Sequence, residues 1–213
     1  MANVKVNSSL AETAGIFAGD GTLYKTNCTG YVLEIRGNYD EETYYKNFVM
    51  PLFEKNLKTK LKIIDRSCKG SKIIGIRKCG KLVLSVFHDL LGFPVGSKER
   101  IVSIPKMFIN NKNLYIPYLR GVFDTDGSVS IREVKKGCIQ PYVSFTSVSE
   151  NHRKQIHKLL KKMGFNAWKE KHRVRICGWS TVSRFFDLIE PHNDLKVNRW
   201  NRILELKMKA QVA

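Results

Sequence analysis

The chain has 213 residues, 43% of them hydrophobic, with 37 Lys and Arg against 19 Asp and Glu. This hydrophobic content supports a packed core and excludes a disordered chain, while the net charge of +18 indicates a polyanionic partner, most often a nucleic acid. The five cysteines are odd in number and form no Cys-x-x-Cys pair, which argues against a disulfide framework and favours a reducing compartment.

Neither a secretory signal nor a membrane span is predicted. The first residues lack the apolar stretch of a signal peptide. Apolar runs stay well short of the roughly 20 residues that cross a bilayer. We therefore expect no membrane partner and an intracellular protein, with a prokaryotic cytoplasm as the first expectation and an organelle as the alternative.

The first predicted helix ends in an acidic turn. Ser8 or Ser9 is a suitable N-cap, with Glu12 as its capping-box partner, and the helix runs to Asp20 and Gly21. Gly21 is expected to leave the helix in the left-handed conformation. The pattern then predicts strands and helices at about 22–24 (strand), 31–36 (strand), 40–57 (helix), 60–65 (strand), 72–78 (strand) and 80–91 (helix).

The second half repeats the first. Residues 14–21 read Ala-Gly-Ile-Phe-Ala-Gly-Asp-Gly, and residues 120–127 read Arg-Gly-Val-Phe-Asp-Thr-Asp-Gly. Residues 77–98 also match residues 175–196, which pairs Lys98 with Lys196. The second copy is predicted to contain strands at 128–133, 142–147, 166–170 and 173–177 and helices at 149–163, 179–189 and 198–209. Each copy therefore reads αββαββα, and the predicted units are 1–98 and 118–213, joined by a linker at 99–117.

Small residues recur on one face of each motif helix. Gly15 and Gly19 are four residues apart, as are Gly121 and Thr125, so each pair shares a helix face. Without bulky side chains between them, the two helix backbones can approach closely. Asp20 and Asp126 would then lie side by side, and two such carboxylates repel each other unless a cation lies between them. A hard divalent ion, Mg²⁺ above all, suits oxygen ligands of this kind.

At these residues the chain resembles the LAGLIDADG homing endonucleases, in their single-chain form with two motifs. The resemblance implies an α+β fold of two pseudo-symmetric αββαββα units, packed through the motif helices, each with a four-stranded antiparallel saddle sheet. It also implies that Asp20 and Asp126 bind metal beside the scissile phosphates, helped by the carbonyls of Gly19 and Thr125. Asp124, opposite Ala18 in the repeat, is expected to be a helix-end or interface residue.

The resemblance suggests further catalytic residues. Lys98 and Lys196 follow the last helix of each unit, where they would stabilise the transition state or position water. Arg36 and Ser147 are assigned to the ends of the second strands, where the family often has Gln holding the water network. Because Arg36 and Ser147 differ from each other, we expect unequal cleavage of the two DNA strands.

Basic residues recur at matching places in both copies. Alternation along a strand puts every second side chain on one face, and a two-stranded ribbon can read the major groove. Other basic residues would hold phosphates only. The predicted DNA-binding residues are Lys25, Arg36, Lys58, Lys60, Lys62, Lys72, Arg77, Arg132, Lys135, Lys136, Lys169, Lys171, Arg173 and Arg175.

The implied function is site-specific, Mg²⁺-dependent hydrolysis of both strands of a DNA duplex. We expect a monomer, a long asymmetric target and a staggered cut with 3′ overhangs. Mn²⁺ should substitute for Mg²⁺, whereas Ca²⁺ should bind without rapid cleavage. An intron-encoded enzyme is favoured over an endonuclease domain of an intein, because the termini carry no splicing residues. An RNA maturase and a non-cleaving DNA-binding protein on the same fold remain open as alternatives.

Overall fold

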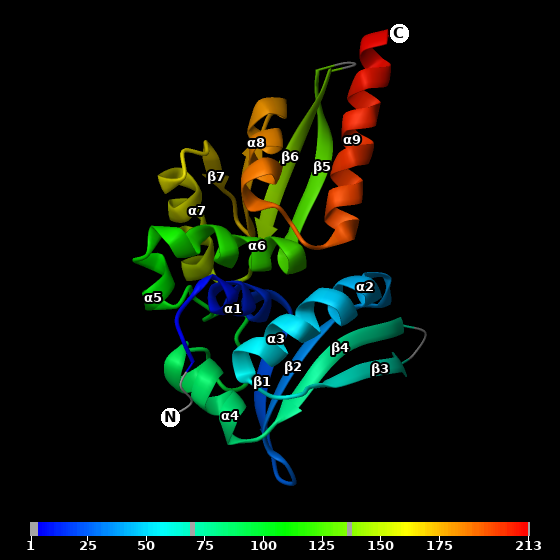
Figure 1. The fold of residues 1–213 in the computed structure, drawn as a ribbon. Helices are drawn as coiled ribbons and strands as arrows, with labels where there is room; N and C mark the ends of the chain where they lie inside the picture. The colour runs from blue at the N-terminus through cyan, green and yellow to red at the C-terminus, as the bar shows by residue number, and fades with distance from the viewer. Residues whose placement is uncertain (1–3, 69–70, 136–137, 213) are drawn as a thin grey trace.

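Two four-stranded antiparallel sheets lie on opposite sides of a central pair of helices, α1 and α6 (Figure 1). The structure is a computed structural model, and it describes residues 4–68, 71–135 and 138–212. The strand orders are β1-β2-β4-β3 in the first sheet and β5-β6-β8-β7 in the second. The predicted α+β fold with two αββαββα units is confirmed.

The first half contains α1 (Ser8–Asp20), β1 (Gly21–Thr26), β2 (Gly30–Asn38), η1 (Tyr39–Glu41), α2 (Glu42–Tyr44), η2 (Tyr45–Val49), α3 (Met50–Leu57), β3 (Lys62–Cys68), β4 (Ser71–Cys79), α4 (Lys81–Leu84) and η3 (Ser85–Leu90). Here η1 is a 3₁₀ helix, whereas η2 and η3 are π-helical. The helix expected at 40–57 is thus a continuous run of four helical segments with a π-turn in the middle.

The second half contains α5 (Lys106–Ile109), η4 (Lys112–Leu114), α6 (Tyr115–Asp126), β5 (Gly127–Lys135), β6 (Cys138–Thr146), α7 (Glu150–Lys162), β7 (Ala167–Lys169), β8 (Arg173–Cys177), α8 (Trp179–Ile189) and α9 (Asp194–Val212). Two boundaries differ from expectation. The second motif helix starts at Tyr115, inside the segment assigned to the linker. It does so because Pro117 lies in the first turn, where its missing N–H is not needed. The last helix spans 19 residues and begins at Asp194, well before 198.

The core repeats in both halves around one phenylalanine of each motif helix. Phe17 packs against Phe87 and Phe93 with ring centroids 4.7 and 4.6 Å away. Its counterpart Phe123 packs 5.0 Å from Phe185. All of these rings are buried, and each fully buried aromatic side chain contributes roughly 1.5–3 kcal/mol. The core thus fixes each motif helix against its own sheet.

The glycines after the two motif aspartates have a spatial role. Gly21 and Gly127 both have a φ of −81°, so the expected left-handed exit from the helix is wrong. A Cβ on either residue would lie well under 3.0 Å from the ring of Phe17 or Phe123. Glycine is required because the chain turns tightly over that ring.

The start of the first motif helix also differs from expectation. Asn7 caps the helix, and its side-chain oxygen accepts a hydrogen bond from the Leu10 N–H at 2.9 Å. Asn is as good an N-cap as Ser. The hydroxyl of Ser9 instead accepts a hydrogen bond from Asn56 on α3 at 2.9 Å. Glu12, the expected capping-box partner, is buried between the two halves.

A buried histidine predicts one pH dependence of stability. The His152 ring lies 2.9 Å from the Tyr118 hydroxyl, and burial lowers its pKa to about 3, helped by the charge of Lys98. The unfolded chain has a pKa of about 6.5 at this residue and binds the proton first, so stability falls as pH drops below 6.5.

Between pH 7 and pH 5, the free energy of unfolding should fall by about 2 kcal/mol less in His152→Gln than in the wild type. Urea unfolding of both proteins at the two pH values measures the difference. Other titrating groups are common to both proteins and cancel. The same loss in the two proteins would show that His152 takes up a proton in the fold as easily as in the unfolded chain.

None of the helices in the described part of the chain combines the length and the apolar character that crossing a membrane requires.

Candidate active centre

The two motif helices touch through their glycines, as the small-residue pattern predicts. A Cβ built on Gly15 would lie well under 3.0 Å from the carbonyl oxygen of Tyr118, and one on Gly121 equally close to that of Glu12. Further along, a Cβ on Gly19 would collide with the Thr125 side chain. No other residue type would let the α1 and α6 backbones approach this closely.

Asp20 and Asp126 are the last residues of these two helices, and they lie close enough for the charge of Asp126 to act on Asp20. The would-be Cβ of Gly19 is 3.4 Å from the Asp126 carboxyl carbon, which shows how near the second acid lies to the first helix. Burial raises the pKa of Asp20 to about 7, and the charge of Asp126 adds to the rise. The pKa of Asp126 is also raised by burial, although its side chain stays open to solvent and Lys98 and Lys196 act against the shift.

A pocket of about 220 Å³ opens beside Asp126. Gly19 lines it from the first half, while Thr146 and Ser147 line it from the end of β6. Oxygen-bearing groups therefore surround an acid that is itself a good ligand for a hard cation. The donor set at this place fits Mg²⁺.

The two matched lysines reach the ends of the motif helices in different ways. The Lys98 ammonium donates to the carbonyl oxygens of Ala18 and Gly19, at 2.7 and 2.6 Å. That of Lys196 donates to the carbonyl oxygen of Gly127 at 2.7 Å. Burial lowers the pKa of Lys98, while the charges of Asp126 and Asp20 oppose the shift. A metal ion that contacts the Gly19 carbonyl oxygen would therefore share this oxygen with the Lys98 ammonium.

The assignment of Arg36 and Ser147 to equivalent positions is wrong by one residue. Gly21 pairs with Ile35 and Gly127 with Phe145, so the register places Thr146 opposite Arg36 in the repeat. Ser147 follows Thr146, and its hydroxyl lies 3.3 Å from the Nδ1 atom of His152.

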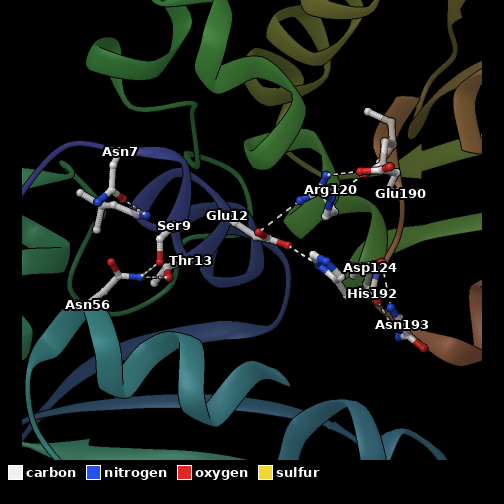
Figure 2. A network of polar contacts seen from close by, with 12 residues as sticks. Asn7, Ser9, Glu12, Thr13, Asn56, Arg120, Asp124, Glu190, His192 and Asn193 are labelled. Carbon is white, nitrogen blue, oxygen red and sulfur yellow. Dashed lines mark hydrogen bonds and ion pairs between the residues drawn. The ribbon is translucent and has the colours of Figure 1, made fainter. Parts of the chain in front are cut away.

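A second polar cluster joins the two halves beside the motif helices (Figure 2). Ligand atoms of Glu12, Asp124 and His192 lie within 4.8 Å of one another. Each already has a protein partner: Glu12 accepts from the His192 ring at 2.8 Å and pairs with Arg120 at 3.6 Å. Asp124 accepts from the backbone N–H of His192 at 3.0 Å and from that of Asn193 at 3.3 Å. Asp124 lies near the end of α6, and these hydrogen bonds stay within the second half. Glu12 makes the contact between the halves, through His192 and Arg120, and we call this cluster the inter-half clasp.

Breaking this clasp should cost stability. Arg120→Met leaves the buried Glu12 carboxylate without its cation, and we expect unfolding to become easier by about 3 kcal/mol. Adding Glu12→Gln should restore at least about 1 kcal/mol, because the unpaired charge is gone. Urea unfolding of the single and double variants tests this.

The surface pair of Lys154 and Glu150, 2.9 Å apart, provides the control. Lys154→Met should change stability by no more than about 0.5 kcal/mol. If Arg120→Met behaves like that control, the clasp contributes nothing to the fold.

Residues 113–190 match the family model of the LAGLIDADG-like domain. The chain has the LAGLIDADG fold. Its architecture matches solved structures of single-chain homing endonucleases over almost its whole length. A mesophilic variant of I-DmoI gives a TM-score of 0.58 at 15% identity, covering 87% of this chain and 97% of that one. I-SmaMI bound to its uncleaved DNA target with calcium ions gives 0.63 at 14% identity, covering 98% and 94%. I-WcaI bound to its DNA recognition sequence gives 0.60 at 14% identity, covering 90% and 87%.

This chain is similar to short segments of two much longer curated proteins. A DNA polymerase of Thermococcus hydrothermalis is 31% identical over 153 residues, which are 71% of this chain and 8% of the polymerase. A probable translation initiation factor IF-2 of Methanocaldococcus jannaschii is 27% identical over 131 residues, 61% of this chain and 10% of the factor. The chain therefore spans about a tenth or less of the length of these relatives.

In the first LAGLIDADG unit, two arginines form ion pairs with a buried carboxylate on the open face of the sheet, the one turned away from the helices. Glu34 is 1% exposed and forms ion pairs with Arg36 and, at 3.5 Å, with Arg77. Lys62 pairs in register with Arg77 and so shares this face. Sequence reasoning predicted these three basic residues but missed Glu34, which an isolated acid in a basic strand pair could have signalled.

The second LAGLIDADG unit has a similar arrangement built from a different acid. Glu170 lies between β7 and β8 and pairs with Arg173 at 2.7 Å and with Arg175 at 3.2 Å. The guanidinium of Arg175 also lies 4.6 Å from the centre of the Tyr142 ring. Trp168, which pairs in register with Arg175, is 46% exposed on the same face. Sequence reasoning missed both aromatic residues.

Several other predicted DNA-binding residues lie elsewhere. Lys58 is the left-handed C-cap of α3 and Lys60 precedes β3, so neither shares a strand face with Lys62. A turn separates Lys169 in β7 from Arg173 in β8, with Lys171 in that turn.

Strand alternation decides the side of the sheet for the rest. Lys25 and Lys72 fall on the helix-covered face with Leu23 and Ile74, whereas Arg132 lies on the open face. Arg132 and Lys135 both belong to β5, and Lys136 lies outside the described residues.

Proposed function

We propose that this protein is a site-specific endonuclease that hydrolyses both strands of a DNA duplex with a divalent metal ion, Mg²⁺ first. The observation that carries the proposal is the pairing of Asp20 and Asp126 at the ends of two helices in contact through Gly15 and Gly121. Burial raises the pKa of both acids, and the charge of Asp126 raises that of Asp20 further. Such a pair costs stability, but it is suited to holding a cation.

The two halves, residues 1–98 and 118–213, would each contribute one acid and one lysine. Asp20 and Asp126 would hold the metal, with the carbonyls of Gly19 and Thr125 in reach. Mg²⁺, when bound, supplies an activated water and neutralises charge on the phosphate. Lys98 and Lys196 add two positive charges at the ends of the same two helices and would stabilise the charge that grows on the phosphate. Ser147 and Thr146 line the pocket where ordered water would lie.

Duplex DNA is the proposed partner because both open sheet faces carry arginines held by carboxylates. I-DmoI has been solved in complex with DNA and Mn and in complex with DNA and Ca, and both structures share this fold. We infer a long target, because two sheets extend to either side of the acids, and an asymmetric one, because the open faces differ in their acids and aromatics. A monomer suffices, since one chain holds both acids.

The finer features are also proposals. The cut would be staggered with 3′ overhangs, Mn²⁺ would replace Mg²⁺, and Ca²⁺ would bind without rapid cleavage. The odd cysteine count supports an intracellular location, prokaryotic cytoplasm first. An intron-encoded origin is proposed as well. Whether the coding frame interrupts a ribosomal RNA gene tests the origin.

Selection from a randomised duplex library tests the function. The wild type is incubated with the library and Mg²⁺, and cleaved molecules are recovered and sequenced beside a sample treated with Asp20→Asn, Asp126→Asn protein. We expect one enriched asymmetric site, cut only by the wild type. Tight binding of a duplex with no cutting by the wild type would contradict the nuclease and leave the non-cleaving DNA-binding protein.

A further inference from the structure

We propose that Tyr45 is a positioning residue for Asp20 and that it makes the two metal-binding acids unequal. This inference rests on the proposed nuclease function. The Tyr45 hydroxyl donates a hydrogen bond to the Oδ2 atom of Asp20 at 2.7 Å, and the Tyr45 side chain is completely buried. Among the side chains that the structure describes, none donates a hydrogen bond to the carboxylate of Asp126.

A glycine makes room for the Tyr45 ring. Gly37 lies on the helix-facing side of β2, and a Cβ there would come within 2.7 Å of the Tyr45 ring and hydroxyl. Any side chain at residue 37 would therefore push the hydroxyl away from Asp20. The register of the two sheets makes Ser147 the counterpart of Gly37 in the second half.

The second half cannot repeat this arrangement. Ser147 carries a side chain, and its hydroxyl lies 3.3 Å from the His152 ring, whose other nitrogen lies 2.9 Å from the Tyr118 hydroxyl. The helix after β2 also contains the π-turn η2, which begins at Tyr45, whereas α7 after β6 is a regular α-helix. A π-turn inserts an extra residue into the helix, so it changes the direction of the side chains that follow from it.

The hydrogen bond fixes how Asp20 presents its oxygens. With Oδ2 held by Tyr45, the carboxylate cannot rotate freely. Among the described residues Oδ1 accepts no hydrogen bond, which favours it as the oxygen that contacts a metal ion. Partners that orient a ligand in this way typically change metal affinity or activity 10- to 100-fold when they are removed. The metal held by Asp20 would thus be bound at a preset angle, and the one held by Asp126 would not.

The test removes one hydroxyl and uses its neighbour as the control. Tyr45→Phe deletes the donor to Asp20. Tyr44→Phe makes the same chemical change one residue earlier, at a buried hydroxyl that has no hydrogen-bond partner among the described residues. Each variant is made in the wild type and in an Asp126→Asn background, in which Asp20 is the remaining acid. Thermal unfolding of each protein checks that it is folded.

Two measurements follow. Mn²⁺ is titrated into the Asp126→Asn proteins without DNA, and free Mn²⁺ is measured by electron paramagnetic resonance. We expect Tyr45→Phe to weaken Mn²⁺ binding about 10-fold and Tyr44→Phe to leave it unchanged. In the otherwise wild-type proteins, end-labelled duplex from the library selection should show one strand cut about 10-fold more slowly by Tyr45→Phe, the other strand within twofold, and nicked product accumulating.

Equal Mn²⁺ affinity in the Tyr45 and Tyr44 variants, or no Mn²⁺ binding in either, overturns the inference. Equal slowing of both strands also overturns it, since that is the result of a general structural defect. These outcomes are distinct from failure of the proposed function, which would appear as a wild type that cuts no duplex at all.

Discussion

The double variant Asp20→Asn, Asp126→Asn is expected to cut its selected duplex at least about 10³-fold more slowly than the wild type while binding it as tightly. Losing the metal removes several kcal/mol of transition-state stabilisation, and each 1.4 kcal/mol is a factor of ten in rate. Single-turnover cleavage and a filter-binding titration on the same duplex separate the two effects. Loss of binding together with cleavage would mean that the acids support the DNA surface and not the chemistry.

The same variant should also be more stable than the wild type at high pH. Burial raises the pKa of Asp20 to about 7, against about 3.9 in the unfolded chain. The fold therefore holds a proton that the unfolded chain releases, and stability falls as pH rises from about 4 to 7. Asn has no proton to lose. In EDTA we expect a gain of about 2 kcal/mol at pH 8, allowing for partial exposure, and a smaller one at pH 5.

An exposed pair of acids provides the matched control. Asp89 and Asp187 correspond to each other across the repeat and both are exposed. Asp89→Asn, Asp187→Asn removes the same two charges and should change urea unfolding by less than about 0.5 kcal/mol at either pH. If the double variant of Asp20 and Asp126 is no more stable than this control at pH 8, the two ionised carboxylates do not lower the free energy of unfolding of the wild type.

Gly15→Ala is expected to destabilise the protein by about 3 kcal/mol. The added Cβ would lie well under 3.0 Å from the Tyr118 carbonyl oxygen, so the α1 and α6 backbones must separate. Gly121→Ala should cost a similar amount from the other helix. Because one separation relieves both clashes, the double variant should cost less than the sum of the two single ones. Urea unfolding measures all three.

Gly30→Ala controls for the loss of a glycine in itself. Gly30 has a φ of +71° with nothing within 4 Å of a Cβ, so alanine there meets only backbone strain, about 1 kcal/mol. Cleavage should fall in Gly15→Ala, because separated helices also separate Asp20 from Asp126, and stay unchanged in Gly30→Ala. Strict additivity of the Gly15 and Gly121 variants would contradict a shared contact.

The motif helices and their acids could be predicted because the information is local and repeated. Asp20 and Asp126 recur in the same glycine-containing context, and small residues four apart define one helix face. Arg77 and Arg175, which match each other in the repeat, could be predicted in the same way. Asp124, which stands opposite Ala18 in the repeat, was expected to be a helix-end or interface residue, and it lies near the end of α6.

The features that could not be predicted are contacts between residues far apart in the sequence, which form only in the folded chain. The contact between Tyr45 and Asp20 spans 25 residues and requires both a glycine in β2 and a π-turn. The off-by-one assignment of Ser147 arose because the two hairpins differ in length: Gly21 pairs with Ile35, but Gly127 pairs with Phe145, which a match of short motifs does not reveal. Glu34 was overlooked because its burial comes from two arginines that lie over it.

The Glu12–Arg120 pair makes each half selective for the other. In the repeat, Arg120 corresponds to Ala14, so two copies of the first half would bring Glu12 against alanine and leave two buried carboxylates without a cation. Such a homodimer is disfavoured, whereas the natural combination is not. Chimaeras that exchange halves between relatives must therefore carry this charge pair intact, whatever DNA their sheets are chosen to read.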